Sequence, residues 1–182
     1  INNQSIDEDS SLSVELSAED IDGDQLYYDA SVDGNASIQL SGTSLSITPD
    51  ENYNGTIIVS YSVSDGEHSI NSSFDLVVSP INDAPILSDI DDQVIDEDGV
   101  LSVELSASDV DGSDLTFLAS VDGNGSVSIE GTTLTVTPPA DYNGNIDVSV
   151  SVSDGDLSSD STTFTLTVNA INDAPVVVNP ID

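Results

Sequence analysis

Apolar and polar residues alternate along most of the chain. In Leu12–Ala18 and again in Phe164–Val168, every second residue is apolar. Successive side chains of a β-strand point to opposite faces, so this period of two predicts strands with one buried face. Turn-forming pairs such as Asp22-Gly23, Asn54-Gly55 and Asp65-Gly66 separate these segments, and no apolar stripe with the 3.6-residue period of a helix is present. The pattern predicts an all-β protein.

The whole pattern occurs twice. Asp7–Asp9 returns 89 residues later as Asp96–Asp98, and, after one inserted residue, Asn82–Pro85 returns 90 residues later as Asn172–Pro175. A period of this length is that of a domain array, because solenoid repeats span only about 20 to 50 residues. We expect two domains, 1–84 and 85–182, with the last residues beginning the next repeat.

The number and spacing of the predicted strands indicate the fold. Each copy has room for about seven short strands separated by turns, which is typical of an immunoglobulin-like Greek-key sandwich. The expected architecture is therefore two tandem Greek-key β-sandwiches.

The charge balance is one-sided. The chain has 35 Asp and Glu residues, no Lys or Arg and a formal net charge of -35. Clustered carboxylates without cationic side chains need metal ions or salt to offset their repulsion. The same deficit argues against nucleic acid and anionic membrane surfaces as partners, since both are bound mainly through Lys and Arg. No apolar run approaches the roughly 20 residues of a membrane helix, so we expect no membrane insertion.

Acidic motifs occur in the same order in both copies. They are Asp-Glu-Asp around Glu8 and Glu97, the pairs Asp20-Ile21-Asp22 and Asp109-Val110-Asp111, the single Asp65 and Asp154, and the Asn-Asp-Ala-Pro linkers at Asn82 and Asn172. This order resembles the bacterial cadherin-like tandem repeats, which are calcium-binding extender repeats of large surface adhesins and secreted multi-repeat proteins. The resemblance covers the entire chain.

The resemblance implies Ca²⁺ bound between adjacent domains. Calcium takes about six to eight hard oxygen ligands, which carboxylates, Asn side chains and backbone carbonyls supply. The implied interdomain ligands are Glu8, Asp50, Glu51, Asn82, Asp83, Asp109, Asp111 and Asp154. The implied half-sites, which would face further domains, are Asp20, Asp22, Asp65, Glu97, Asp141, Asn172 and Asp173.

The sequence also departs from the cadherin pattern. The leading Asp of the linker is replaced by Pro80 or Ala170, and only Asp50-Glu51 and Asp141 loosely match the cadherin Asp-Arg-Glu motif. The alternative interpretation is that the acids are solvated turn residues. The number of bound ions stays open.

The resemblance predicts a structural extender or adhesion segment of a long extracellular or cell-surface protein, with neighbouring repeats as its partners. One alternative is a polysaccharide-binding or cell-aggregating module, for which Tyr27 and Tyr61 are the candidate aromatic contacts. A further alternative is an extracellular filament, in which Val176–Val178 adds as a strand to the next subunit. We expect no enzyme, because the single histidine, His68, is matched by Leu157 in the second copy and no catalytic constellation accompanies it.

Overall fold

The computed structural model describes residues 1–112 and 114–175, which form β-strands joined by turns. The chain divides into two compact units, Ile1–Ile81 and Asn82–Asp182. The sequence had led us to expect this boundary after residue 84. Val176–Val178, the strand-addition segment of the filament alternative, lies outside the described residues. None of the described residues lies in a helix, so this part of the chain contains no helix suited to crossing a membrane. The all-β prediction is confirmed.

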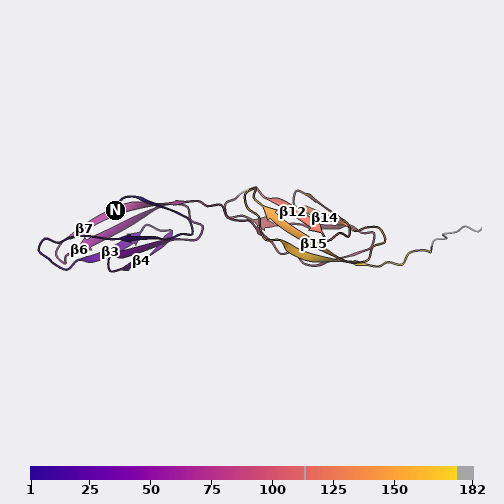
Figure 1. Cartoon of the computed structure of the whole chain (residues 1–182), viewed down its shortest axis with the longest axis horizontal. Helices are drawn as coiled ribbons and strands as arrows, with labels where there is room; N and C mark the ends of the chain where they lie inside the picture. Colours follow the sequence, from indigo (N-terminus) through magenta and orange to yellow (C-terminus); the bar gives the residue numbers. More distant parts are fainter. Residues whose placement is uncertain (113, 176–182) are drawn as a thin grey trace, which may run out of the picture. The chain divides into compact units, whose positions relative to one another are not determined.

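The first unit is a two-layered sandwich (Figure 1). Its strands are β1 (Gln4–Asp7), β2 (Leu12–Glu15), β3 (Tyr27–Val32), β4 (Ala36–Ser41), β5 (Ser44–Pro49), β6 (Gly55–Ser64) and β7 (Ser69–Ser79). One sheet has the order β1-β7-β6-β3 and the other the order β2-β5-β4. Strand β1 runs parallel to β7, and the other pairs are antiparallel. The chain changes sheet between β1 and β2, β2 and β3, β3 and β4, and β5 and β6, as in a Greek-key sandwich.

The second unit repeats this topology. Its strands are β8 (Ile86–Leu87), β9 (Gln93–Asp96), β10 (Leu101–Glu104), β11 (Ala107–Ser108), β12 (Thr116–Val121), β13 (Ser126–Glu130), β14 (Thr133–Thr137), β15 (Gly144–Ser153) and β16 (Thr162–Asn169). The sheets β12-β15-β16-β9 and β10-β14-β13 correspond to those of the first unit. A two-stranded sheet of β8 and β11 is added, and it has no counterpart in the first unit.

Alternate residues of each strand fill the space between the sheets. In the first unit Leu45 and Ile47 face Ile57 and Leu76, and all four side chains are fully buried. The second unit has its own core, centred on Phe164 and the strands β14, β15 and β16. Burial of apolar surface contributes about 25 cal/mol per Å², so these two cores are the main source of stability in each unit.

Tyrosines hold the turn that leads into the long central strand of each unit. The Tyr53 hydroxyl donates to the Thr56 carbonyl at 3.2 Å, and the Tyr142 hydroxyl donates to the Asn145 carbonyl at 2.8 Å. Gly55 has φ +143°, and a Cβ there would lie 2.8 Å from the Tyr53 hydroxyl. The turn therefore requires glycine both for its backbone conformation and for the space that the tyrosine occupies.

Candidate metal sites

Glu8 is a buried carboxylate at one end of the first unit. Its side chain is only 5% exposed. The Ile81 backbone N–H donates to Glu8 Oε1 at 2.6 Å, and Asn54 Nδ2 donates to Oε2 at 3.3 Å. Because the chain has no Lys or Arg, these neutral donors offset only part of the cost of burying the charge. A cation would stabilise the carboxylate further.

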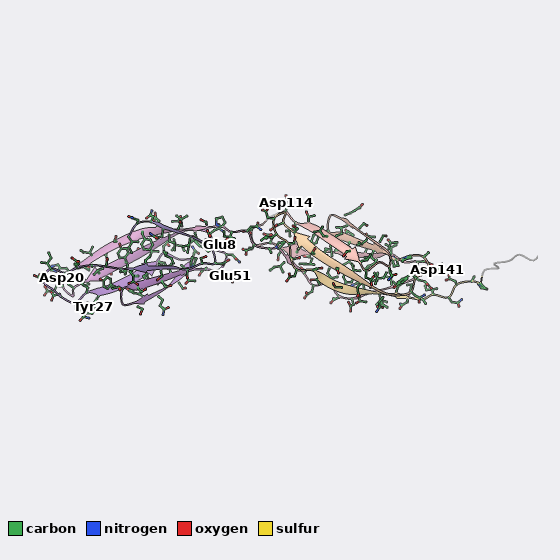
Figure 2. All side chains as sticks on the ribbon, in the orientation of Figure 1. Glu8, Asp20, Tyr27, Glu51, Asp114 and Asp141 are labelled. Atoms are coloured by element: carbon green, nitrogen blue, oxygen red, sulfur yellow. The ribbon has the colours of Figure 1, made fainter. Side chains whose placement is uncertain are left out.

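Asp50 and Glu51 follow β5 at the same end of the first unit. Figure 2 shows Glu8 and Glu51 at this end and Asp20 at the opposite one. Both Asp50 and Glu51 are exposed, and the Asp50 backbone is fixed by a hydrogen bond from its N–H to the Asn35 carbonyl at 2.9 Å. This end of the unit therefore presents one buried carboxylate and two exposed ones.

The linker residues of the second unit contact its acidic loops. Asn82 Nδ2 donates to Asp154 Oδ2 at 2.7 Å, and the Asp83 N–H donates to Asp111 Oδ2 at 2.8 Å. The Asn82 bond is the main reason that the pKa of Asp154 lies below its usual value, with the Leu157 N–H as a further donor. Local folding thus brings four of the expected ligands together at the N-terminal end of this unit.

Asp109 completes this group. Its Oδ1 accepts the Asp111 N–H at 2.8 Å, which closes the turn after β11. Its Oδ2 is buried and has no hydrogen-bond partner among the described residues. A buried carboxylate oxygen without a partner costs free energy, about 1–3 kcal/mol or more. The donor set consists of hard oxygens, so it fits the coordination preferences of calcium.

The corresponding acids of the first unit form a similar turn. Asp20 Oδ1 accepts the N–H groups of Asp22 at 2.9 Å and Asp24 at 3.0 Å. Asp65 Oδ1 accepts the N–H groups of His68 at 2.6 Å and Glu67 at 2.7 Å, and these bonds lower the pKa of Asp65. The imidazole of His68 is largely exposed and lies 3.6 Å from Asp65 Oδ2.

The far end of the second unit repeats the environment of Glu8. Glu97 is 8% exposed and accepts the Ile171 N–H, as Glu8 accepts that of Ile81. Asn172 Nδ2 donates to the Asp173 carbonyl at 3.2 Å, and Asp141 is exposed in a left-handed turn with φ 56°. The buried glutamate is therefore a feature of each repeat.

Sequence reasoning missed the role of the second aspartate in Asp-Glu-Asp. Asp9 Oδ1 accepts the Asn52 N–H at 3.0 Å, and Asp98 Oδ1 accepts the Asp141 N–H at 3.1 Å. Both aspartates have positive φ, 57° and 64°. Each ties the turn that carries the buried glutamate to the turn after the neighbouring strand. The repetition of the full triplet was the signal that could have indicated this role.

A family profile shows to which protein family the chain belongs. The Bacterial Ig domain family matches residues 1–74 and again residues 82–167. The chain belongs to this family. The two matches cover both units, so the protein is a tandem of bacterial Ig domains. No curated protein sequence matches the chain significantly.

Solved structures show the same tandem architecture. Human protocadherin-24 EC1-2 has a TM-score of 0.54 and 18% identity, over 89% of this chain and 88% of that one. Drosophila N-cadherin EC1-4 has a TM-score of 0.53 and 15% identity, over 94% of this chain and 47% of that one. At these identities the likeness concerns the fold, and it confirms the cadherin-like and Ig-like tandem.

An endo-fucoidan hydrolase of glycoside hydrolase family 107 also matches. The TM-score is 0.39 and the identity 18%, over 94% of this chain and 28% of that chain. The bacterial Ig tandem thus spans about 28% of the length of that protein. The hydrolase activity is that of the longer protein, and at this TM-score it has no bearing on the tandem.

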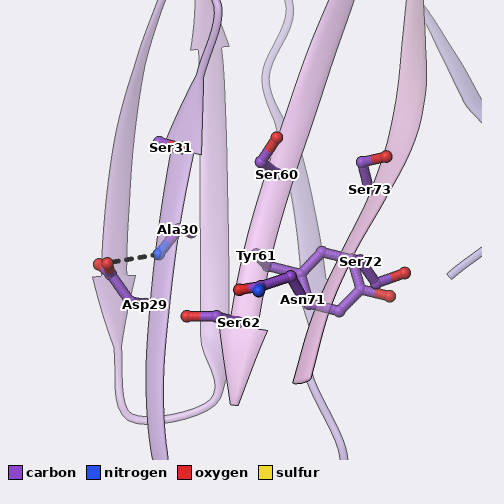
Figure 3. Close-up of a pocket in the computed structure, with 9 residues that line it drawn as sticks. All are labelled: Asp29, Ala30, Ser31, Ser60, Tyr61, Ser62, Asn71, Ser72 and Ser73. Atoms are coloured by element: carbon purple, nitrogen blue, oxygen red, sulfur yellow. Dashed lines mark hydrogen bonds between the residues drawn. The ribbon is translucent and has the colours of Figure 1, made fainter. Parts of the chain in front are cut away.

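The first bacterial Ig domain also has a shallow polar groove on the sheet of β3, β6 and β7. Its volume is about 470 Å³, and Figure 3 shows hydroxyl, amide and carboxylate groups along it. Tyr61 lines the groove, and its ring centroid lies 6.3 Å from that of Phe74. A hydrogen bond with Ser72 and the adjacent terminal amine lower the pKa of Tyr61. The tyrosine ring is therefore engaged within the domain, and Tyr27, which is 58% exposed, does not line the groove.

Proposed function

We propose that this bacterial Ig tandem is a structural extender or adhesion segment of a long extracellular or cell-surface repeat protein. Calcium at the junction between the two domains stiffens the segment. Neighbouring repeats of the same protein are its main partners. No catalytic role is assigned to any residue.

The contacts of the linker in the second domain carry this proposal. Asn82 and Asp83 hydrogen-bond to Asp154 and Asp111, while Oδ2 of Asp109 stays buried without a hydrogen-bond partner among the described residues. Hydrogen bonds alone thus leave the carboxylates of this group incompletely stabilised. The chain supplies no Lys or Arg for them, and a divalent cation is the simplest remaining counter-charge.

Ligands from both domains would hold the ion. The second domain would supply Asn82, Asp83, Asp109, Asp111 and Asp154, and the first would supply Glu8 with Asp50 and Glu51. Bound calcium would supply the positive charge that offsets the negative charge of these carboxylate oxygens. Asn82 and Asp83 of the linker hydrogen-bond to Asp154 and Asp111 of this acidic group, and these bonds fix the orientation of the linker. A joint held by both domains resists bending, whereas a free linker does not.

Thermal unfolding with calcium and with excess chelator tests the proposal. Ionic strength is held constant with NaCl so that general screening of the acidic charge is equal in both conditions. Calcium at about 100 times its Kd should stabilise the protein by about 2.7 kcal/mol, and the midpoint should keep rising with concentration. Magnesium is the matched control, since it prefers a smaller octahedral shell with bound water.

Small-angle scattering on the same samples tests whether calcium stiffens the segment. The expected result is a narrower distribution of interdomain distances with calcium than with chelator. If calcium raises the midpoint without changing the scattering, the ion binds but does not stiffen the segment. If neither quantity changes, the acids are solvated turn residues and the tandem is a passive spacer.

Polysaccharide binding is the second candidate function, and the groove of Figure 3 is the observation that favours it. Asp29, Asn71 and the serines between them offer the hydrogen-bonding groups that sugars use. Asp29 is replaced by Leu118 in the second domain, so this property belongs to the first domain alone. A glycan array on which the tandem binds nothing would eliminate this candidate.

A further inference from the structure

The groove of the first domain is lined by two rows of polar side chains. Each row crosses strands β3, β6 and β7, and its members are direct partners in the strand pairing. Neighbouring strands lie about 4.8 Å apart, and alternate residues of one strand about 6.7 Å apart, so the six side chains form a regular polar grid. Figure 3 shows Asp29, Ser62 and Asn71 in one row of this grid and Ser31, Ser60 and Ser73 in the other.

The polar grid keeps its hydrogen-bonding capacity for a ligand. Neither Asn71 nor any of the four serines forms a side-chain hydrogen bond with another residue of the part of the chain that the structure describes. Asp29 Oδ1 accepts the Ala30 N–H at 3.0 Å, and Oδ2 is left to accept from a ligand. Hydroxyls and an amide both donate and accept, whereas the carboxylate only accepts.

The same face of the second domain lacks these properties. Ser149 and Thr163, which match Ser60 and Ser73, are bonded to each other through their hydroxyls at 3.0 Å. Leu118 stands in the place of Asp29. The available polar groups are therefore a feature of the first domain and not of the repeat.

Apolar side chains stand at both ends of the polar grid. Tyr27 lies two residues before Asp29 on β3 and so points to the same face, where its side chain is 58% exposed. Ile58 lies two residues before Ser60 on β6 and is 45% exposed. The six-residue step along a strand from one end to the other spans about 20 Å, which is enough for an extended chain of several sugar rings.

This arrangement fits the chemistry of a neutral sugar chain. A pyranose ring has apolar C–H faces that can pack on the ring of Tyr27, and it has hydroxyls at its rim that need donors and acceptors. The protein has no Lys or Arg to pair with a uronate or a sulfate. Asp29 within the grid, and Asp75 opposite Ile58, would repel such acidic groups.

We propose that this face of the first domain binds a chain of neutral pyranose sugars along its strands. One sugar ring stacks on Tyr27, and the hydroxyls of the following rings bond to the polar grid. This assignment rests on the polysaccharide-binding candidate above and gives it a ligand class and a site. Asp29 and Asn71 are not among the candidate metal ligands, so binding of the sugar does not require calcium.

Titration calorimetry of the whole tandem tests the ligand class. The probes are neutral hexasaccharides of glucose, of mannose and of galactose, and the acidic hexagalacturonate, all measured in chelator. At least one neutral probe should bind, with the same affinity when calcium is present, and hexagalacturonate should not. Binding of hexagalacturonate alone would overturn the proposal and leave polysaccharide binding as a function. Binding of no probe would also overturn it, and the glycan array then decides whether the wider function fails too.

Variants of the exposed tyrosine test the site. Tyr27→Ala should weaken the binding of the neutral probe about tenfold, because the stacking surface is lost. Tyr27→Phe restores the ring and should bind more tightly than Tyr27→Ala. The matched control is Thr116→Ala, at the corresponding position of the second domain, and it should leave the affinity unchanged. Equal affinities of Tyr27→Ala and the unmodified protein, with equal thermal midpoints, would show that the sugar binds elsewhere.

Discussion

Asp109→Asn should stabilise the second domain in chelator and reduce the further stabilisation that calcium adds. Asparagine keeps the oxygen that accepts the Asp111 N–H at 2.8 Å, so the turn is retained. It replaces a buried anionic oxygen that has no hydrogen-bond partner among the described residues. In chelator the substitution should therefore stabilise the second domain, by about 1–3 kcal/mol.

With calcium the same substitution removes a charged ligand. Calcium affinity depends on the number of charged ligands, and a loss of at least about tenfold reduces the calcium-dependent stabilisation by about 1.4 kcal/mol. For a domain of this size each kcal/mol shifts the midpoint by about 4–8 °C. The rise of the thermal midpoint that calcium induces should therefore be smaller in the variant, by about 4–8 °C for each kcal/mol of calcium-dependent stabilisation that is lost.

Asp20→Asn is the matched control in the first domain. Asp20 closes the same kind of turn by accepting the Asp22 N–H at 2.9 Å, but it belongs to a half-site. In dilute solution its substitution should leave the calcium-induced rise unchanged. Differential scanning calorimetry of the three proteins, in calcium and in chelator at one ionic strength, measures both effects. The reasoning is refuted if Asp109→Asn lowers the midpoint in chelator and leaves the calcium-induced rise as large as in the unmodified protein.

Four further predictions concern stability. Because the pKa of Asp154 is lowered, its contribution to the free energy of unfolding is present above the usual pKa of 3.8 and is lost as the pH falls through the lower folded value. In a series of thermal midpoints measured at different pH, Asp154→Asn should therefore reduce the fall of the midpoint at acid pH. Tyr53→Phe should cost about 1 kcal/mol through loss of the bond to the Thr56 carbonyl. Gly55→Ala should cost less in the Tyr53→Phe background than alone, because the phenol oxygen 2.8 Å from the new Cβ is then absent; equal costs in a urea-unfolding cycle would contradict this. Leu45→Ala should destabilise the first domain by about 2–5 kcal/mol in the same assay, and a loss below 1 kcal/mol would mean that the core collapses around the cavity.

Much of the fold could be predicted because its determinants are local and repeated. The alternation in Leu12–Ala18 sets which side chains are buried, and the Asn-Gly and Asp-Gly pairs set where strands end. The candidate ligands were named through the resemblance to cadherin-like repeats, and the recurrence of their motifs at a fixed spacing places them at equivalent positions in each copy. The prediction of two cadherin-like and Ig-like sandwiches was confirmed for this reason.

Other features depend on contacts between residues far apart in the sequence. The burial of Glu8 arises because the end of β7 and the turn of Asn54 close over it, and neither position is near Glu8 in the chain. Asp9 acquires its role only where the Asn52 turn comes within 3.0 Å. The pairing of Tyr61 with Phe74, which engages the tyrosine ring within the first domain, likewise needs two adjacent strands in register.

The sequence by itself determined the repeat, the strand pattern, the excess of acid and the positions of the acidic motifs, because these are properties of residue order and composition. Only the tertiary structure decided which carboxylates are buried, which are joined by hydrogen bonds, and that Ile86–Leu87 pairs with Ala107–Ser108 in the second domain. Pairing between strands and the closure of turns over a carboxylate are non-local interactions, so the order of residues alone does not reveal them.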